Sequence, residues 1–558
     1  MRDAARTPDP GALPATGLGW AATAARLRRR DCAAAVALLA ALAGLCPGRG
    51  WAATAGYRDP GAPAGGGALP ALGDAGDMTP LQERKLGDRI IRELYRDPDY
   101  VDDPPIGEYV DGIWRALRAA GRQRGEITPE LDERYAWVFV LGHDRTINAF
   151  ALPGGYMGLN LGLIGAVSSR DELASVLGHE QSHITQRHIA RLLGKQERQT
   201  PLMLAAMVAG LLAGMRNPQA GAALAMGGQA AVVRQQLSFS RTMEREADRV
   251  GYAVMTQAGF APQGFVSMFE KLQRAARLDD NGDWPFLRTH PLTTERIADM
   301  QQRQQRLGPQ PPPPTDWEAL LLAARARVLG NPGVDVLRAW AGEPDQPGFA
   351  GQPAPERAAA LYAAALSQSQ LRDLPRARAL AARVAPLLGG DARGLRQARL
   401  LQAELALADQ QPRQALELLA GVSAAAPGAP RDAASQAGRA LLLLRSRAQL
   451  QSGQPQAAAA ALQTWVADHP DDAGAWTALA GASEALGQRL RALRAEGEAQ
   501  FAQRDLQGAI DRWRAAQDFS RTGGASAGDL IEASIVDTRL RQAREQLKLQ
   551  QDEERKQR

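Results

Sequence analysis

The chain has 558 residues, and its 66 lysines and arginines against 61 aspartates and glutamates give a formal net charge of +5. With 45% hydrophobic and 23% charged residues it is not a disordered chain, and its length allows more than one domain. Aromatic residues make up only 5% while alanine and leucine abound, which favours helices over a β-sandwich. No lysine- and arginine-rich stripe with interleaved aromatics is present, so we expect no nucleic-acid partner.

The N-terminus has the three parts of a secretory signal peptide, which we place at residues 1–55. A cationic block at 26–31 precedes an apolar core at 32–45, and small residues suited to cleavage follow at 50–56. The core is short for a membrane span, although a membrane anchor is the alternative. Both cysteines lie inside this segment, so the mature chain would have no thiolate for catalysis or metal binding. The segment predicts a periplasmic protein.

Residues 56–78 are rich in glycine, alanine and proline and predict a flexible leader. A first domain is expected over 79–307, where Thr79, Pro80 and Gln82 have the pattern of a capped helix start. In chain order its periodicity predicts helices over about 80–95 and 105–121, strands over 134–142 and on both sides of a Pro-Gly-Gly turn within 146–164, and a helix from Asp171 to about Leu193.

The apolar segment 201–232 is divided by "RNPQ", and neither half is long enough to span a bilayer alone. It predicts either a helical hairpin that touches a membrane surface or two buried core helices. A further helix is expected from about Arg241 to Ala258. The proline-rich stretch 308–316 predicts a stiff linker after the first domain.

A second domain, all-α, is expected over 317–545, where the chain is rich in alanine, leucine, glutamine and arginine. Similar turn-then-helix phrases recur at 373–381, 410–419, 452–462 and 504–513. Helix pairs of about 34 residues with small residues at the crossing points are the pattern of tetratricopeptide repeats, which stack into a solenoid. Irregular helical pairs are the alternative, because the repeats are degenerate. Residues 546–558 predict a solvated polar tail.

The segment 177–193, "LGHEQSHITQRHIARLL", contains three of the six histidines. On a helix, positions i and i+4 share a face, so His179 and His183 can direct ring nitrogens at one point. Glu180 lies next to that face and can reach a water molecule held there. This is the HExxH pattern with which metallopeptidases hold zinc and accept a proton from water. The alternative is a pair of polar histidines on an exposed helix; His188 lies off the face and is expected to be an ordinary surface or packing residue.

A catalytic zinc ion needs a third protein ligand, and a mature chain without cysteine makes a carboxylate the economical choice. The segment 240–255 supplies Glu244 and Asp248, one turn apart on a predicted helix. Glu244 is the candidate ligand, and Asp248 on the same face could hydrogen-bond the outer nitrogen of a ligating histidine. Glu246 is the local alternative, but it points about 160° away from that face.

Four motifs occur in order along the chain: "NAFALPGG" at 148–155, the HExxH segment, "SRTMEREAD" at 240–248 and "THPLTTERI" at 289–297. Together they resemble the minigluzincin metallopeptidases, which include the HtpX heat-shock proteases and the CaaX prenyl proteases. The resemblance covers about residues 79–305. The predicted signal peptide and tetratricopeptide repeats make the chain most similar to a periplasmic branch of this family.

The resemblance implies an α+β zincin-type metallopeptidase domain, mostly helical with a small sheet, followed by an all-α tetratricopeptide solenoid. It implies one Zn²⁺ per chain, with His179, His183 and Glu244 as ligands and Glu180 as general base. It also implies that His290 lies over the metal, as a fourth ligand in a closed resting enzyme or as a stabiliser of the tetrahedral oxyanion. A His-Pro turn with neither role is the alternative.

Two further groups of residues take roles from the resemblance. Arg296 would hold the loop of His290 or neutralise the oxyanion, or else pair structurally with a carboxylate. An edge strand would bind an extended substrate through backbone hydrogen bonds, with a core strand as the alternative. This strand consists of Asn148, Ala149, Phe150, Ala151 and Leu152.

The predicted function is that of a periplasmic zinc metalloendopeptidase that cleaves misfolded or stalled envelope proteins, with a chaperone-like role in outer-membrane β-barrel assembly. The resemblance implies that the repeats bind unfolded or misassembled outer-membrane proteins and the β-barrel assembly machinery. Peripheral membrane contact is expected through 201–232. The alternatives are a non-catalytic zinc-containing chaperone or scaffold and a membrane-associated CaaX-type peptidase.

Overall fold

The computed structural model describes residues 78–194, 240–278, 285–422 without 307, 309, 310 and 312, 438–524 and 529–556. The predicted signal peptide, the leader up to residue 77 and the apolar segment 201–232 lie outside the described residues. Within the described ranges, none of the helices combines the length and the apolar character that a bilayer span requires.

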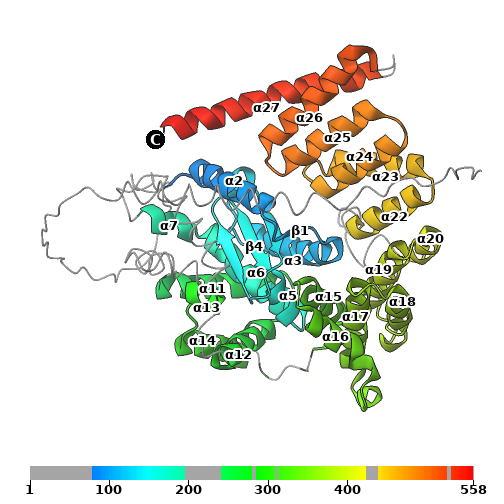
Figure 1. Cartoon of the computed structure of the whole chain (residues 1–558). Helices are drawn as coiled ribbons and strands as arrows, with labels where there is room; N and C mark the ends of the chain where they lie inside the picture. Colours follow the sequence, from blue (N-terminus) through cyan, green and yellow to red (C-terminus); the bar gives the residue numbers. More distant parts are fainter. Residues whose placement is uncertain are drawn as a thin grey trace, which may run out of the picture. The chain divides into compact units, whose positions relative to one another are not determined.

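The first region of the chain is mostly helical and begins with a capped helix. Thr79 accepts a hydrogen bond from the backbone N–H of Gln82, whose side chain accepts one from the N–H of Thr79, so the predicted capping box is present. The helices of this region, most of which are labelled in Figure 1, are α2 (Pro80–Arg96), α3 (Pro104–Gln123), α4 (Pro129–Arg134), α5 (Leu161–Ala166), α6 (Arg170–Thr185), α7 (His188–Gly194), α11 (Arg241–Gln257), α12 (Gln263–Leu278), α13 (Pro285–Thr289) and α14 (Thr294–Gln305).

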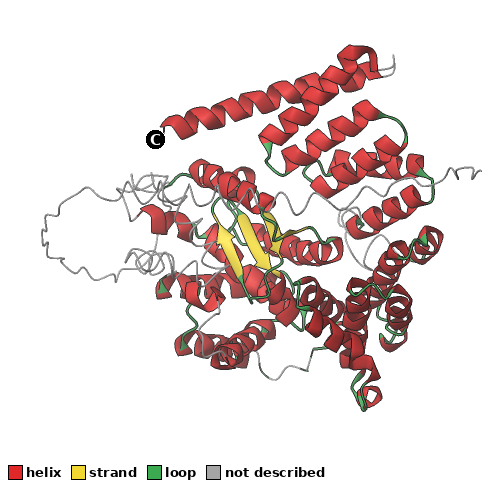
Figure 2. Ribbon diagram, viewed as in Figure 1, coloured by secondary structure: helices red, strands yellow, loops and turns green. Residues whose placement is uncertain are grey.

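A small mixed sheet lies among these helices and is drawn in yellow in Figure 2. Its strands are β1 (Tyr100–Val101), β2 (Val138–Gly142), β3 (Ala149–Leu152) and β4 (Tyr156–Asn160). The strand order is β1-β2-β4-β3, in which β2 and β4 are parallel and the other pairs antiparallel. The strand β3 is therefore an edge strand of the described sheet. The predicted α+β fold of this region is confirmed.

One predicted helix is divided in the structure. The sequence pattern predicted a single helix from Asp171 to about Leu193, but α6 ends at Thr185 and α7 begins at His188. Arg187 between them has φ 53°, a left-handed conformation that cannot continue an α-helix. Its guanidinium is held by the buried carboxylate of Glu83, with Nε 2.7 Å from Oε1. This contact comes from α2, far away in sequence, so helical periodicity could not reveal the break.

The helices α6 and α11 cross at a point where both have a glycine. A Cβ added to Gly251 would lie 2.9 Å from the backbone carbon and oxygen of Gly178 and from the nitrogen of His179. The two backbones are thus in direct contact, which places the first turns of α11 beside the histidines of α6. Both helices belong to one apolar core shared with the sheet, α3 and α12; examples from these elements are Trp114, Met157, Leu177, Val254 and Phe265.

The second region of the chain is a run of paired helices, as expected of a helical repeat domain. Its long helices are α15 (Trp317–Leu329), α16 (Val334–Gly342), α17 (Ala354–Gln370), α18 (Leu374–Ala382), α19 (Ala392–Ala408), α20 (Pro412–Ala420), α22 (Arg439–Gln451), α23 (Pro455–Asp468), α24 (Ala473–Ala485), α25 (Arg489–Ala502), α26 (Leu506–Phe519) and α27 (Leu530–Lys556). Each predicted turn-then-helix phrase starts one of them, at α18, α20, α23 and α26. The helix α27 continues to Lys556, so the predicted polar tail is helical over most of its length.

Candidate metal centre

Four buried side chains from three parts of the chain converge on one point. His179 and His183 come from α6, Glu244 from α11, and His290 follows α13; one potential ligand atom from each lies within 4.8 Å of all the others. The Nε2 atoms of His179 and His183 are 3.0 Å apart. Each of these atoms lies 3.5 Å from an oxygen of Glu244. The structure therefore brings together the three residues that the sequence suggested as ligands, and His290 with them.

The donor set and its spacing fit a zinc ion. Zinc binds imidazole nitrogen and carboxylate oxygen at about 2.0–2.2 Å in a tetrahedron, which places neighbouring ligand atoms about 3.3 Å apart. The distances of 3.0 and 3.5 Å among His179, His183 and Glu244 are close to this value. All of these side chains are buried, so a cation held between them would be shielded from bulk water. The residues present thus fit the metal that the sequence pattern predicts.

Local electrostatics favour the metal-binding protonation states of His183 and Glu244. For His179, burial would lower the pKa, but Asp248 and Glu244 outweigh it and raise that pKa to about 9, so a bound metal must displace a proton from this ring. Burial, together with the neighbouring imidazoles, holds the pKa of His183 well below its usual range, so its ring is neutral at pH 7. Burial would raise the pKa of Glu244, but the imidazoles of His290 and His179 outweigh it and hold that pKa well below its usual range. A neutral imidazole and an ionised carboxylate are the forms that coordinate a cation.

Asp248 of α11 and Arg296 of α14 contact the side chains that converge at the candidate metal site. Asp248 Oδ1 lies 2.9 Å from Nδ1 of His179, the nitrogen opposite to the one that faces the group. Arg296 lies 2.6 Å from Glu244 Oε2 and donates a hydrogen bond of 3.0 Å to the backbone carbonyl of Pro291. The arginine also lies 2.6 Å from Oδ2 of Asp248, so it pairs with two carboxylates and fixes the loop that carries His290.

Glu180 is completely buried beside the four converging side chains. Its Oε2 accepts a hydrogen bond of 2.8 Å from the backbone N–H of Ala151. Its Oε1 has no hydrogen-bond partner among the described residues and lies 3.5 Å from Nε2 of His290. Burial raises the pKa of this carboxyl group. A buried oxygen without a hydrogen bond, next to these four potential metal ligands, is available to accept a proton.

The strand predicted to bind substrate begins one residue later than expected and ends at the expected residue, Leu152. Asn148 precedes β3, and the strand itself holds Ala149, Phe150, Ala151 and Leu152. Among the described strands β3 pairs with β4 alone, and the N–H of Ala151 is donated to Glu180. The free side of this edge strand thus adjoins the carboxylate of Glu180.

Two residues near the centre were not recognised from sequence. His188 was expected to be an ordinary surface or packing residue, but it is fully buried and its Nδ1 lies 2.9 Å from Nδ1 of His183. Glu246 faces away from the four potential metal ligands, as predicted. It faces His188 instead, and Oε2 of Glu246 lies 3.1 Å from Nε2 of His188. The helix break at Arg187 produces this arrangement, and helical periodicity gave no sign of it.

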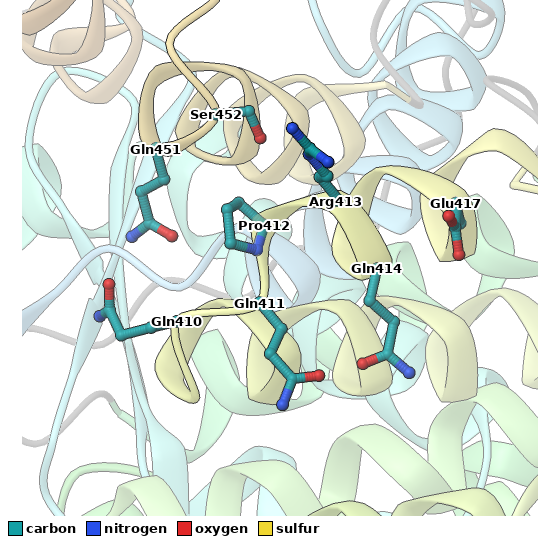
Figure 3. A pocket seen from close by; sticks show the side chains of 8 residues that line it. All are labelled: Gln410, Gln411, Pro412, Arg413, Gln414, Glu417, Gln451 and Ser452. Carbon is teal, nitrogen blue, oxygen red and sulfur yellow. The ribbon is translucent and has the colours of Figure 1, made fainter.

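A separate pocket of about 570 Å³ occurs in the repeat region, between the turn before α20 and the end of α22 (Figure 3). The side-chain amides of Gln410 and Gln451 point towards one another in it. Its lining contains no histidine, so it is not a second metal site of this type. The lining residues are Gln410, Gln411, Pro412, Arg413, Gln414, Glu417, Gln451 and Ser452.

These features define a metallopeptidase, and a sequence model of Peptidase family M48 matches residues 127–304. The chain belongs to peptidase family M48. It is homologous to the β-barrel assembly-enhancing protease of Escherichia coli K12, with 31% identity over 439 residues that make up 77% of this chain and 83% of that protein.

Other relatives match over shorter stretches. A relative from Vibrio cholerae is 34% identical over 271 residues, which are 48% of this chain and 53% of that protein. The mitochondrial metalloendopeptidase OMA1 of Saccharomyces cerevisiae is 26% identical over 226 residues, 39% of this chain and 62% of that protein. This chain thus spans about half the length of the Vibrio cholerae relative but most of the Escherichia coli one.

Proposed function

We propose that this chain is a zinc metalloendopeptidase that hydrolyses peptide bonds in misfolded or stalled envelope proteins. The observation that carries the proposal is the position of Glu180, buried beside the four converging ligand atoms with Oε1 free of hydrogen bonds among the described residues. Membership of family M48 agrees with this chemistry.

His179, His183 and Glu244 would hold one Zn²⁺, with Asp248 fixing the ring of His179 and Arg296 fixing Glu244. When bound, the ion supplies a Lewis acid that polarises the scissile carbonyl. Asp248 would fix the tautomer of His179 as well as its orientation, because a carboxylate on the outer nitrogen of a ligating histidine holds the proton on that nitrogen.

Glu180 performs the proton transfers. Its Oε1 accepts a proton from the attacking water, and the same carboxyl group returns it to the leaving amine nitrogen. The N–H of Ala151 fixes the other oxygen, so the carboxylate has one orientation. A raised pKa suits this double role, because a group that both takes and gives a proton works best with a pKa near the working pH.

The edge strand β3 would bind the substrate. An extended peptide can add to a free strand edge through backbone hydrogen bonds, which give affinity with little dependence on side chains. Since Ala151 contacts Glu180, a peptide along this edge passes the general base. Substrates that expose extended segments, such as unfolded proteins, fit this mode of binding.

His290 would regulate the centre. Its Nδ1 lies 3.4 Å from Nε2 of His179 and 3.0 Å from Oε1 of Glu244, in the place of a fourth ligand. Its ring stacks on Phe286, with centroids 4.7 Å apart. We assign this arrangement to a closed resting enzyme, in which substrate must displace the imidazole. A permanently closed centre would instead make the protein a zinc-containing scaffold, which is the second candidate function.

The nature of the clients and the location are parts of the same proposal. The name of the Escherichia coli relative refers to β-barrel assembly, and the predicted signal peptide would place this chain in the periplasm. The repeats would bind unfolded outer-membrane proteins or the assembly machinery, since helical repeats commonly present protein-binding surfaces. The amide-lined pocket of Figure 3 is suited to backbone groups of a bound segment. Peripheral membrane contact would involve 201–232.

The test compares Glu180→Gln with the parent protein on casein and on a urea-unfolded outer-membrane β-barrel protein. The amide cannot accept a proton, so hydrolysis should fall about a thousandfold while the zinc content stays the same. Glu130→Gln, an exposed glutamate on α4, is the control and should retain parental activity. Undiminished hydrolysis by Glu180→Gln would refute the role of Glu180, and a parent inactive under all conditions would favour the scaffold.

A further inference from the structure

The outer side of His183 contacts another imidazole. While Nε2 of His183 faces the metal group, its Nδ1 lies 2.9 Å from Nδ1 of His188. The two rings are steeply inclined, with centroids 4.9 Å apart and an interplanar angle of 74°. Both side chains are fully buried. Two nitrogens at this distance inside a protein must share one proton, with one ring as donor and the other as acceptor.

The second nitrogen of His188 leads to a carboxylate. Its Nε2 lies 3.1 Å from Oε2 of Glu246, which also receives Nη1 of Arg191 at 3.1 Å. The contacts thus run from His183 through His188 to Glu246, and Glu246, at the outer end, is less buried than His188.

The proton positions follow from the chemistry of metal binding. A histidine that coordinates through Nε2 needs its lone pair there, so its proton must be on Nδ1. Nδ1–H of His183 then donates to Nδ1 of His188. The only proton of His188 is left on Nε2, from which it donates to Glu246. In this arrangement each ring nitrogen of His188 and the carboxylate of Glu246 has one hydrogen-bonding role, either donor or acceptor, that matches its neighbour.

We propose that His188 and Glu246 are positioning residues that hold His183 in its metal-binding tautomer and orientation. The inference rests on the proposed zinc function. Outer-sphere hydrogen bonds of this kind fix the ring of a ligating histidine and increase its basicity. For His179 a carboxylate, Asp248, is in direct contact with the outer nitrogen. For His183 the carboxylate acts through an intervening imidazole.

The break between α6 and α7 explains how His188 reaches this position. On a continuous helix a residue five positions after His183 would point about 140° away from it. Arg187 has φ 53° and is anchored to Glu83, so the chain turns back and α7 starts with His188 under the ring of His183. The turn therefore has a specific consequence for the metal centre, beyond ending a helix.

The experiment measures zinc dissociation constants of the full-length purified protein by competition with a fluorescent chelator, with the unfolding midpoint of each metal-free variant as a check of the fold. His188→Ala should weaken zinc binding about 10- to 100-fold. His188→Asn, whose side-chain oxygen can accept from Nδ1–H of His183, should recover most of this loss. The control is His143→Ala, which removes an imidazole bonded to the carbonyl of Leu329 and should bind zinc like the parent.

A double-mutant comparison shows whether Glu246 acts on zinc binding through His188 or whether the two residues contribute independently. Glu246→Ala alone should weaken zinc binding about three- to tenfold, and adding it to His188→Ala should cause no further loss, because Glu246 acts only through His188. Additive losses, or His188→Ala with parental affinity, would overturn the inference. If His188→Ala does not fold, His188→Asn with and without Glu246→Ala gives the same comparison. A parent protein that binds no zinc would instead refute the proposed function itself.

Discussion

The guanidinium of Arg296 and the carboxylate of Asp248 form two hydrogen bonds, of 2.6 and 2.8 Å, in the interior of the first region. The same carboxylate lies 2.9 Å from Nδ1 of His179. Burial would raise the pKa of Asp248, but Arg296 and His179 outweigh it and lower that pKa. One ionised side chain thus connects α14, α11 and α6 at the metal centre.

Asp248→Asn should weaken zinc binding about 10- to 100-fold, because a neutral amide supports His179 poorly and leaves Arg296 without its charge partner. Chelator competition measures this. Asp299→Asn is the matched control, since Asp299 also pairs with an arginine of α14 but at an exposed position. Equal affinities for Asp248→Asn and the control would show that Asp248 has no part in holding the metal.

Gly251→Ala should move α11 away from α6. The new methyl group would meet the backbone of Gly178 at 2.9 Å, and a backbone cannot rotate away as a side chain can. We expect a loss of about 1–2 kcal/mol in the free energy of unfolding, together with a lower zinc content as Glu244 leaves the histidines. Gly112→Ala, on α3 with no atom within 4 Å of the new methyl group, should be neutral or stabilising. Normal zinc content in Gly251→Ala would show that the metal site tolerates a displacement of α11 from α6.

His290→Ala should increase the hydrolysis of casein about tenfold, because an imidazole that competes with substrate for the centre reduces the active fraction. Initial rates at saturating zinc are the measurement. His469→Ala, whose ring packs against Trp465 in the repeat region, should not change the rate. A large fall in rate for His290→Ala would mean that the imidazole stabilises the oxyanion and does not inhibit.

The repeat region contains a pH-dependent ion pair. Asp472 accepts hydrogen bonds of 2.8 Å from Arg439 and from the indole of Trp465, and it caps α24 through the N–H of Ala475. Burial would raise the pKa of Asp472, but these donors, Arg439 first, lower it below the usual 3.8. A carboxyl group with a lower pKa in the folded state stabilises the fold above its unfolded pKa, and this contribution is lost as the pH falls through the folded pKa.

Asp472→Asn should therefore reduce the free energy of unfolding by about 2 kcal/mol at pH 7, and the difference from the parent should shrink below about pH 4. Denaturation with urea at pH 7 and pH 3 checks both parts. Asp468→Asn removes the same charge from an exposed site in the preceding helix and should have little effect at either pH. A difference that is constant with pH would exclude the ionic contribution.

Much of the site could be predicted from the sequence because its strongest features are local. The HExxH spacing fixes His179 and His183 on one helical face, and this depends only on the helical repeat. The capped start at Thr79 and the repeated turn-then-helix phrases are local in the same way, and both are present in the structure. The four motifs in order were sufficient to indicate the family.

The long-range parts could not be predicted from local pattern. Arg187 ends α6 through a contact with Glu83, about a hundred positions earlier in the chain, and no property of residues 177–193 indicates it. As a result the contacts of His188 with His183 and with Glu246 were not foreseen. Helical periodicity cannot be extended through a turn that a distant side chain holds.

By itself the sequence determined which side chains share a helical face, because backbone geometry alone sets that spacing. The tertiary structure decided which faces meet. The contact of Gly178 with Gly251 brings Glu244 to the histidines, and the loop fixed by Arg296 brings His290 to the same point. The physical reason is that side chains from separate elements converge only when packing sets the distance and rotation between those elements, and packing depends on contacts between residues far apart in the chain.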